Sequence, residues 1–359
     1  MKKAAFTLLL ISIVIAACNA EASAAEQKTK TAAPSRRSYR DMRQHTFNEK
    51  EGVHIGALAV SPDGGMLAYV TDENMNSDIF VKGANSKTVA QKTDNPAADE
   101  FPAFSPDGNS LAFASKRNGN WDIYLMYLNG GKAPRQLTTG RNDKLSPTWS
   151  HDGKKIAYSR RSSTGLPEIW IYNLEKGTFS FLATGENPVY SPVDDSIVFQ
   201  KLNNKGFFSI WVTDDEGMEE VNILTSNTEG YFSPSWSYDG AKIIFISGMM
   251  KQINAAKGQA SPERAAKTAK GENAIEDTFD VTERKGNNLW VINRDGANLT
   301  RLTDNEKGAM SCPRFSRDGR VYFINSEGAT PNIFSVIPEF VTTDSAQPST
   351  GGNLKAGKK

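Results

Sequence analysis

The sequence predicts an all-β fold: a six-bladed β-propeller of four-stranded antiparallel blades, closed by an N-terminal strand. Three observations predict it. A turn motif occurs six times, a similar order of apolar and polar segments surrounds each copy, and a segment near the N-terminus repeats the pattern of a fourth strand. Repeats of about 40 to 45 residues that are rich in short strands are typical of propeller blades.

The turn motif has the form Ser-x-Asp-Gly. Its Asp can accept hydrogen bonds from backbone N–H groups of the turn, and its Gly can take the positive φ that the turn requires. The copies begin at Ser61, Ser105, Ser150, Ser191 (where the motif reads Ser-Pro-Val-Asp), Ser237 and Ser316. Their spacing indicates one blade for each copy.

The segments around each turn predict the same four strands. A short apolar strand precedes the turn, an apolar or alternating strand follows it, and a third and a polar fourth strand complete the blade. The third strands share an aromatic position, occupied by Phe80, Tyr124, Trp170, Trp211, Trp290 and Phe334. We expect these side chains to pack between neighbouring blades, because large flat side chains fill the wedge between twisted sheets.

The last blade lacks a fourth strand of its own after Phe334. Near the N-terminus, however, Arg43-Gln44-His45-Thr46 copies the fourth-strand sequence Arg135-Gln136-Leu137-Thr138. The N-terminal segment is therefore expected to supply the outer strand of blade six, which leaves the ring without an open edge at the junction. This places the propeller at residues 42–340, with residues 341–359 as a disordered tail.

The last interval between turn motifs is long because of an insert at residues 248–287, between the second and third strands of blade five. Within it, Ser261–Lys270 combines an N-cap, a Pro in the first turn and good helix formers, which predicts a short helix. By propeller topology this loop lies on the face that carries the connections between blades. Two interpretations remain open, a disordered decoration and a functional lid.

The N-terminus has the features of a signal peptide at residues 1–17. Lys2 and Lys3 precede an uncharged run from Ala4 to Ala17, which is shorter than the roughly 20 residues that span a bilayer as a helix. Residues 18–41 are rich in Ala, Ser and Lys and nearly lack large apolar side chains. Such a segment cannot bury enough surface to fold, so it is expected to be a flexible tether.

The signal sequence ends in Ile15-Ala16-Ala17-Cys18, which resembles the lipobox of bacterial lipoproteins. The resemblance implies lipid on Cys18 and a membrane anchor that faces the periplasm. Asn19 follows the cysteine, and by resemblance to enteric sorting signals it implies delivery to the outer membrane. The alternative is ordinary cleavage, for instance after Ala20 or Ala24, which would give a soluble periplasmic protein.

The repeated S-P-D-G-x-x-L-A-F pattern, followed by D-I-F/Y/W and then Q/R-L-T, resembles the propeller of TolB-like periplasmic proteins and related WD-like repeats. The resemblance covers about residues 43–340 and implies the fold, since the matching residues are the structural ones. TolB proteins also carry an N-terminal α/β domain and bind the peptidoglycan-associated lipoprotein of the Tol–Pal system. We expect this chain to lack that domain and to be lipidated itself, and both expectations depart from the TolB pattern.

The composition argues against several functions. A net charge of +1 lacks the basic excess of a nucleic-acid-binding surface. The three histidines, His45, His54 and His151, show no metal-ligand spacing. The chain also lacks a G-x-S-x-G nucleophile elbow and a phosphate-binding glycine loop. Cys312 lies on an inner strand and is expected to be a buried, inert thiol. We therefore expect no enzymatic activity, no cofactor and no metal site.

The residues that break the repeat lie in the connections between the fourth strand of one blade and the first strand of the next. Several are acidic and would lie near the mouth of the channel, where they could attract a cationic group, a polar peptide segment or a cation. The candidate binding residues are Asp99, Glu100, Asp143, Lys144, Glu186, Glu229 and Tyr231. The alternative is that these loops are polar because water surrounds them.

These observations favour a non-enzymatic, monomeric binding scaffold of the cell envelope that holds a protein segment or an envelope polymer at the channel face. A saccharide-binding or saccharide-cleaving propeller, with acids of the channel loops as catalysts, is the alternative. A purely structural envelope component is a third hypothesis.

Overall fold

The computed structural model describes residues 38–46, 53–73, 75–129, 131–162, 165–248, 287–304, 308–326 and 331–341. The predicted signal peptide, Cys18, nearly all of the tether, the tail after residue 341 and most of the blade-five insert, including the predicted helix, lie outside these residues. The chain divides into two compact units, at residues 1–37 and 38–359, and every described residue belongs to the second.

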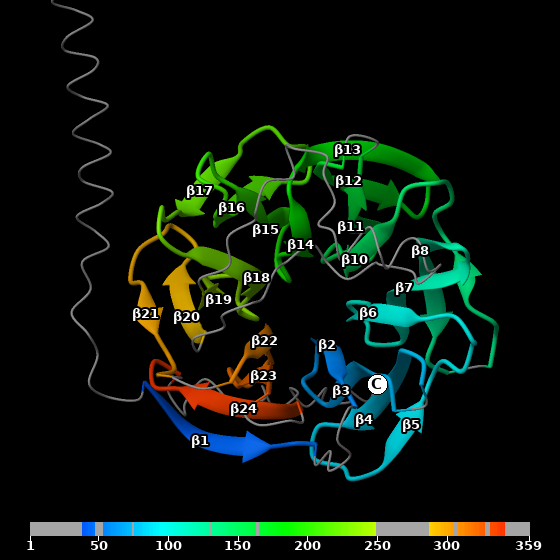
Figure 1. Cartoon of the computed structure of the whole chain (residues 1–359), viewed down its shortest axis with the longest axis horizontal. Helices are drawn as coiled ribbons and strands as arrows, with labels where there is room; N and C mark the ends of the chain where they lie inside the picture. The colour runs from blue at the N-terminus through cyan, green and yellow to red at the C-terminus, as the bar shows by residue number, and fades with distance from the viewer. Residues whose placement is uncertain are drawn as a thin grey trace, which may run out of the picture. The chain divides into compact units, whose positions relative to one another are not determined.

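The described strands form six four-stranded antiparallel sheets arranged as blades around a ring (Figure 1). This confirms the predicted all-β propeller. Blade one contains β2 (Ile55–Val60), β3 (Met66–Thr71), β4 (Asp78–Gly83) and β5 (Val89–Gln91). Blade two contains β6 (Asp99–Phe104), β7 (Ser110–Asn118), β8 (Asn120–Tyr127) and β9 (Arg135–Gln136). Blade three contains β10 (Lys144–Trp149), β11 (Lys155–Arg161), β12 (Pro167–Asn173) and β13 (Thr178–Thr184).

The remaining three blades follow the same order. Blade four contains β14 (Glu186–Tyr190), β15 (Ser196–Leu202), β16 (Phe208–Asp214) and β17 (Val221–Leu224). Blade five contains β18 (Gly230–Trp236), β19 (Lys242–Gly248), β20 (Asn288–Asn293) and β21 (Thr300–Arg301). Blade six contains β22 (Met310–Phe315), β23 (Val321–Asn325) and β24 (Asn332–Pro338), and its outermost strand is β1 (Tyr39–Gln44).

The turn between the first two strands of a blade is held by its Ser and Asp side chains. In blade two, Ser105 Oγ donates to Asp107 Oδ1 at 2.5 Å, and the same oxygen accepts the Asn109 N–H at 3.0 Å. Gly108 takes φ 70°. The Ser–Asp hydrogen bond recurs in blades one, three, five and six. Blade four has Val193 in place of Asp, and its turn is built differently.

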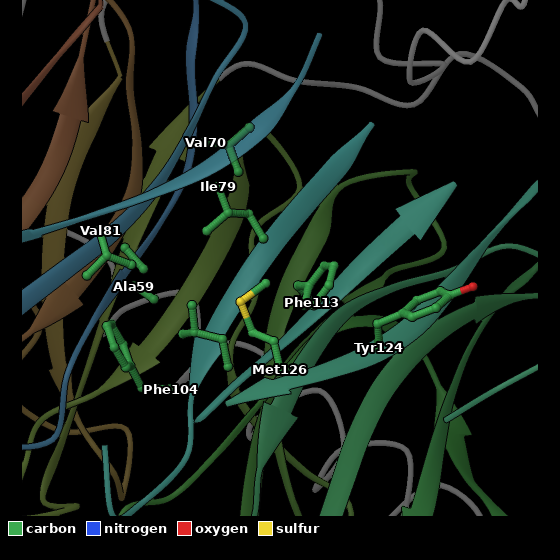
Figure 2. Close-up of a cluster of buried hydrophobic side chains, with 10 residues drawn as sticks. Ala59, Val70, Ile79, Val81, Phe104, Phe113, Tyr124 and Met126 are labelled. Carbon is green, nitrogen blue, oxygen red and sulfur yellow. The ribbon is translucent and has the colours of Figure 1, made fainter. Parts of the chain in front are cut away.

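The third-strand aromatic residues pack between blades, as predicted. Each belongs to a hydrophobic cluster that joins its own blade to the preceding one. Figure 2 shows the cluster between blades one and two, where Tyr124 and Phe113 of blade two pack with Val70 and Ile79 of blade one. In every blade the second strand places another aromatic ring opposite the third-strand one, as Phe113 does for Tyr124. The second-strand rings are buried in every blade.

The N-terminal strand closes the ring. β1 pairs antiparallel with β24, with Gln44 opposite Phe334, and it lies at the rim of blade six (Figure 1). Beyond its end, the His45 N–H donates to the Ile333 carbonyl at 2.8 Å. Arg320, which is 6% exposed, forms an ion pair with Asp41. As predicted from their similar sequences, Arg43–Thr46 and Arg135–Thr138 therefore have the same structural role at the outer edge of a blade.

Candidate functional site

The innermost strand of each blade begins on one face of the ring, which we call the channel face. The second strand ends on this face and the third begins there, as shown by the pairing of Asp99 with Ser115 and of Ser115 with Asp122. The innermost strands β2, β6, β10, β14, β18 and β22 surround the centre of the ring (Figure 1). The ends of the blade-five insert also lie on this face, because Gly248 pairs with Gly230 at the start of β18.

The innermost strands carry a repeated irregularity close to the channel face. Each strand shifts register once against its neighbour, as expected for a β-bulge. In five blades the bulge residue has a positive φ of 51° to 54° and precedes a proline; these residues are Phe101, Ser146, Asn187, Ser233 and Cys312. Neighbouring bulges can touch, since Ser146 Oγ donates to Asn187 Oδ1 at 2.8 Å. In these five blades a Pro lies three residues before the turn Ser, and this spacing is the sequence signal that could have predicted the bulges.

A pocket of about 260 Å³ opens between blades one and two on the channel face. Its walls are His54, Gly56, Ala57, Val70, Asp72, Ser77, Glu100 and Phe101. Asp72 is held in place because its Oδ1 accepts the His54 N–H at 2.7 Å. Of the candidate binding residues, Glu100 lines this pocket. Asp72 and Phe101 were missed, because no local pattern shows that the end of β3 faces the start of β6.

Asp99, the neighbour of Glu100, is fully buried and held by Arg117. The Arg117 Nη2 lies 3.0 Å from both carboxylate oxygens of Asp99, and the guanidinium stacks on the Tyr124 ring at 4.7 Å from its centroid. A buried carboxylate needs such a partner, because an uncompensated charge in the interior is costly. The Asp99 side chain therefore lies inside the protein, where its ion pair with Arg117 stabilises the strands that form the channel face.

The equivalent position of blade three carries Lys144 instead of an acid. Lys144 is 4% exposed, and its Nζ lies 2.8 Å from Asp122 Oδ1. Asp143, beside it, accepts the Trp121 N–H at 3.1 Å and is partly exposed. The structure thus places Asp143 and Lys144 in contacts that join blades two and three.

The junction of blades one and two has two acids where the next junction has an ion pair. Asp78 corresponds to Asp122, and it accepts hydrogen bonds from Thr93 Oγ1 at 3.0 Å and from Gln91 Nε2 at 3.2 Å. Burial raises the pKa of Asp78, and the negative charge of Asp99 raises it further. Among the described residues, Asp78 therefore lacks the counter-charge that Lys144 gives Asp122, whereas Asp99 is paired with Arg117.

The three remaining candidates lie along blades four and five. Glu186 Oε1 accepts from Gln200 Nε2 at 3.0 Å, and Gln200 Oε1 accepts the Ser233 N–H of the next blade. Tyr231 is 5% exposed and packs against Phe245, and its hydroxyl donates to Glu229 Oε1 at 3.3 Å. Burial raises the pKa of Tyr231 above its ordinary value. None of these three side chains lines the pocket, which is formed by residues of blades one and two.

Among the described residues, no three His, Cys, Asp or Glu side chains lie together in a way that could hold a metal ion. In the same part of the chain, no helix has the length and apolar character needed to cross a membrane.

The model of the TolB beta propeller domain family matches residues 41–274. The chain belongs to this family. Among curated relatives of this TolB-family propeller, the Tol-Pal system protein TolB of Francisella tularensis is 29% identical over 107 residues. That alignment covers 28% of this chain and 25% of the relative, so the chain spans about a quarter of the length of the curated relatives it matches.

Solved structures share the fold of this TolB-family propeller. The crystal structure of TolB from Acinetobacter baumannii superposes with a TM-score of 0.54 at 16% identity, over 77% of this chain and 64% of the other. An oligogalacturonate lyase from Vibrio parahaemolyticus gives a TM-score of 0.53 at 13% identity, over 84% and 94% of the two chains. Because a TolB protein and a lyase fit equally well, the shared fold does not decide the activity.

Proposed function

We propose that this TolB-family propeller is a non-enzymatic binding scaffold of the cell envelope, and that its channel face holds a segment of an envelope protein. The observation that carries the proposal is the pocket between blades one and two, lined by His54, Asp72, Glu100 and Phe101. It lies on the face where propellers offer loops from every blade. The family membership and the name of the relatives, Tol-Pal system protein, support an envelope partner.

The pocket walls suit a long side chain with a cationic end. Val70, Ala57 and Phe101 supply apolar surface, while Asp72 and Glu100 supply carboxylates. Lys and Arg carry apolar stems with a charged head, so one such side chain satisfies both kinds of wall. We therefore expect the bound segment to insert a Lys or Arg here.

The surrounding face supports binding because it is rigid. Arg117 fixes Asp99, Lys144 is fixed by Asp122, and Gln200 joins Glu186 to the next blade. A site on a rigid scaffold loses little conformational entropy when a partner binds. This organisation supports recognition of a segment in one defined pose.

The location of the protein is part of the proposal. The lipobox at Cys18 supports a lipid anchor that faces the periplasm, with the outer membrane as the destination; a soluble periplasmic protein is the alternative. Metabolic labelling with a fatty-acid probe tests the anchor. We expect label in the full-length protein and none in Cys18→Ala, and equal label in both would refute the anchor.

The binding role is tested with Asp72→Asn combined with Glu100→Gln, which removes two pocket charges and retains the size of each side chain. Substitution of Asp99 is unsuitable because it would leave Arg117 without its buried partner. Glu175→Gln is the matched control, since Glu175 is an exposed acid on the outer side of blade three. The wild type and the control should retain the same envelope protein from a solubilised envelope, and the double variant should lose it.

Two results would overturn the proposal. The first is retention of the same protein by the pocket variant at the wild-type level. The second is turnover of peptidoglycan or another envelope polysaccharide by the purified protein, because that result favours the saccharide-cleaving alternative.

A further inference from the structure

The outermost strand of blade three differs from the other outer strands. β13 has seven residues, whereas β5, β9, β17 and β21 have three, two, four and two. It lies at the rim of the ring (Figure 1) and pairs only with β12 in the part of the chain that the structure describes. Half of its backbone N–H and C=O groups therefore point away from the sheet, as in any edge strand.

The exposed side chains of this edge are aromatic. Phe179 is 49% exposed and Phe181 is 52% exposed. Phe179 packs against Tyr172 with ring centroids 4.8 Å apart, and Phe181 meets the edge of Trp170 at 6.0 Å. Because strand side chains alternate, both phenylalanines lie on one face of the blade, the face that carries Trp170 and Tyr172. The edge therefore presents a fixed apolar surface beside unpaired backbone groups.

The edge also lacks the features that normally prevent strand pairing. Natural edge strands are blunted by charge, by proline or by shortness. Among the described residues, the other long outer strand is β1, which carries Arg40, Asp41 and Arg43 and has a register shift among them. β13 reads Thr-Phe-Ser-Phe-Leu-Ala-Thr, without charge or proline, and its register shift lies at the Leu182 end. Thr178–Phe181 is thus a regular, uncharged and accessible edge.

We propose that β13 receives an extended segment of a partner protein as a fifth strand of blade three. The edge backbone fixes the conformation of the segment, because only another extended chain satisfies a row of N–H and C=O groups. The side chains fix its character. Phe179 and Phe181 require apolar residues at alternate positions, and the absence of charge on β13 favours a segment that is uncharged between its ends.

A second copy of the chain fits this edge less well. Burying a whole aromatic side chain removes about 150 to 250 Å² from water, so the half-exposed Phe179 and Phe181 offer roughly 200 Å² per molecule. A symmetric pair of edges would bury on the order of 400 Å² through these rings, against the about 1,200 Å² of a stable interface. A flexible segment avoids this limit because it needs no second folded surface to approach.

The test uses the full-length protein and a designed peptide of ten residues, with alternating Val and Thr between terminal Lys residues. A control peptide has two central Val replaced by Pro, which cannot pair as a strand. Hydrogen exchange of Thr178–Phe181 is the readout, since strand addition protects the outward amides. We expect the first peptide to slow their exchange at least about tenfold and the control peptide to leave it unchanged.

The side-chain contribution is tested by Phe179→Thr combined with Phe181→Thr, which retains strand propensity and removes the rings. The matched control is Val221→Thr, because Val221 is 50% exposed on β17, the outer strand of blade four. The double variant should bind the labelled peptide at least about tenfold more weakly, and the control should bind it as the wild type does. Equal thermal midpoints of the three proteins show that the blade stays folded.

Three outcomes would overturn the proposal. They are unchanged exchange in Thr178–Phe181 with the peptide at about 1 mM, equal peptide affinity of the double variant and the wild type, and protection that arises without peptide as the protein concentration increases. The last outcome assigns the edge to a second copy of the chain. None of them depends on the channel face.

Discussion

The Thr46 hydroxyl donates to Asn332 Oδ1 at 3.0 Å, although 286 residues separate the two in the sequence. The same hydroxyl oxygen accepts the Ile333 N–H at 2.8 Å. Within blade two, Thr138 Oγ1 makes the equivalent bonds to Asp122 at 3.0 Å and to the N–H of Ile123 at 2.8 Å. The contact that joins the two ends of the ring is therefore the contact that holds the outer strand of an ordinary blade.

Thr46→Val is expected to weaken the closure of the ring. Val has a similar shape but no hydroxyl, so the N–H of the buried Ile333 loses its acceptor, at a cost of about 1 to 3 kcal/mol. Urea denaturation should show the loss of unfolding free energy, and hydrogen exchange should be faster in β1 and β24. Thr138→Val is the control, since its effect should centre on blade two. Unchanged exchange in β24 of Thr46→Val would contradict this account.

Substitution of two equivalent acids is expected to have opposite consequences. Asp122→Asn leaves the buried Lys144 without its counter-charge, which costs about 3 to 5 kcal/mol when one partner of a buried pair is removed. Asp78→Asn removes a charge that burial and Asp99 already disfavour, so the variant should be as stable as the wild type or more stable at pH 7. Denaturation of both variants at pH 7 measures the difference.

The pH dependence gives a second check on Asp78. Its pKa is raised in the folded state, so the folded state binds more protons than the unfolded state above the unfolded pKa of about 3.9. The contribution of Asp78 to the unfolding free energy is therefore lost as the pH rises from about 3.9 through the pKa of the folded state. Asp78→Asn should remove this loss. If Asp78→Asn loses as much unfolding free energy at pH 7 as Asp122→Asn, the acid stabilises both junctions equally, and this account is wrong.

The fold was predictable because its determinants are local and repeated. The Ser–Asp hydrogen bond and the positive φ of Gly108 are properties of one short turn, and six copies of the turn give the number of blades. The closure was predictable for the same reason, since Arg43–Thr46 repeats a local pattern.

The candidate site was predictable only in part, because the burial of a side chain on the channel face depends on side chains that are distant in the sequence. Asp99 and Glu100, predicted to lie in a connection, are the first two residues of β6, yet Arg117 holds Asp99 inside the protein while Glu100 lines the pocket. No pattern in the sequence indicates which of the two carboxylates faces the pocket. Asp72 was missed because it belongs to blade one, and only the packing of blade one against blade two brings it to the pocket beside Glu100.

His45 is expected to make the ring closure sensitive to acid. Its Nδ1 lies 3.0 Å from the Ala84 carbonyl and its Nε2 lies 2.7 Å from Ser335 Oγ, and burial is the main cause that lowers its pKa. The unfolded state therefore binds more protons below the unfolded pKa of about 6.5, and stability is lost as the pH falls from 7 toward 5. Urea denaturation should show a smaller loss for His45→Gln than for the wild type.

The location of the acid effect provides its control. Protonation of His45 should speed hydrogen exchange in β1 and β24 and leave exchange in blade three unchanged. Identical pH profiles of the unfolding free energy in the wild type and His45→Gln would rule out this role.

Arg294→Met is expected to release an electrostatic contact that holds Asp194 in the turn of blade four. Arg294, which follows β20 in blade five, donates to Asp194 at 2.6 Å and to Ser196 Oγ, and its guanidinium lies 5.3 Å from the Trp236 ring centroid. Burial raises the pKa of Asp194, but the hydrogen bonds from Arg294, Ser191 and Ser196 outweigh it and lower the pKa to about 2. Met retains the apolar stem and removes the charge, so the pKa of Asp194 should rise toward about 3.9.

The sign of the stability effect follows from the lowered pKa. The contact contributes above about pH 4 and is lost as the pH falls through about 2, so the wild type and Arg294→Met should differ most near neutral pH and converge in acid. Both side chains are more than one-third exposed, so solvent screens the pair and added salt should narrow the difference. NMR titration of the Asp194 carboxyl in both proteins is the decisive measurement. An unchanged Asp194 pKa in Arg294→Met would mean that the turn side chains alone hold this carboxylate, and that blade five contributes nothing to it.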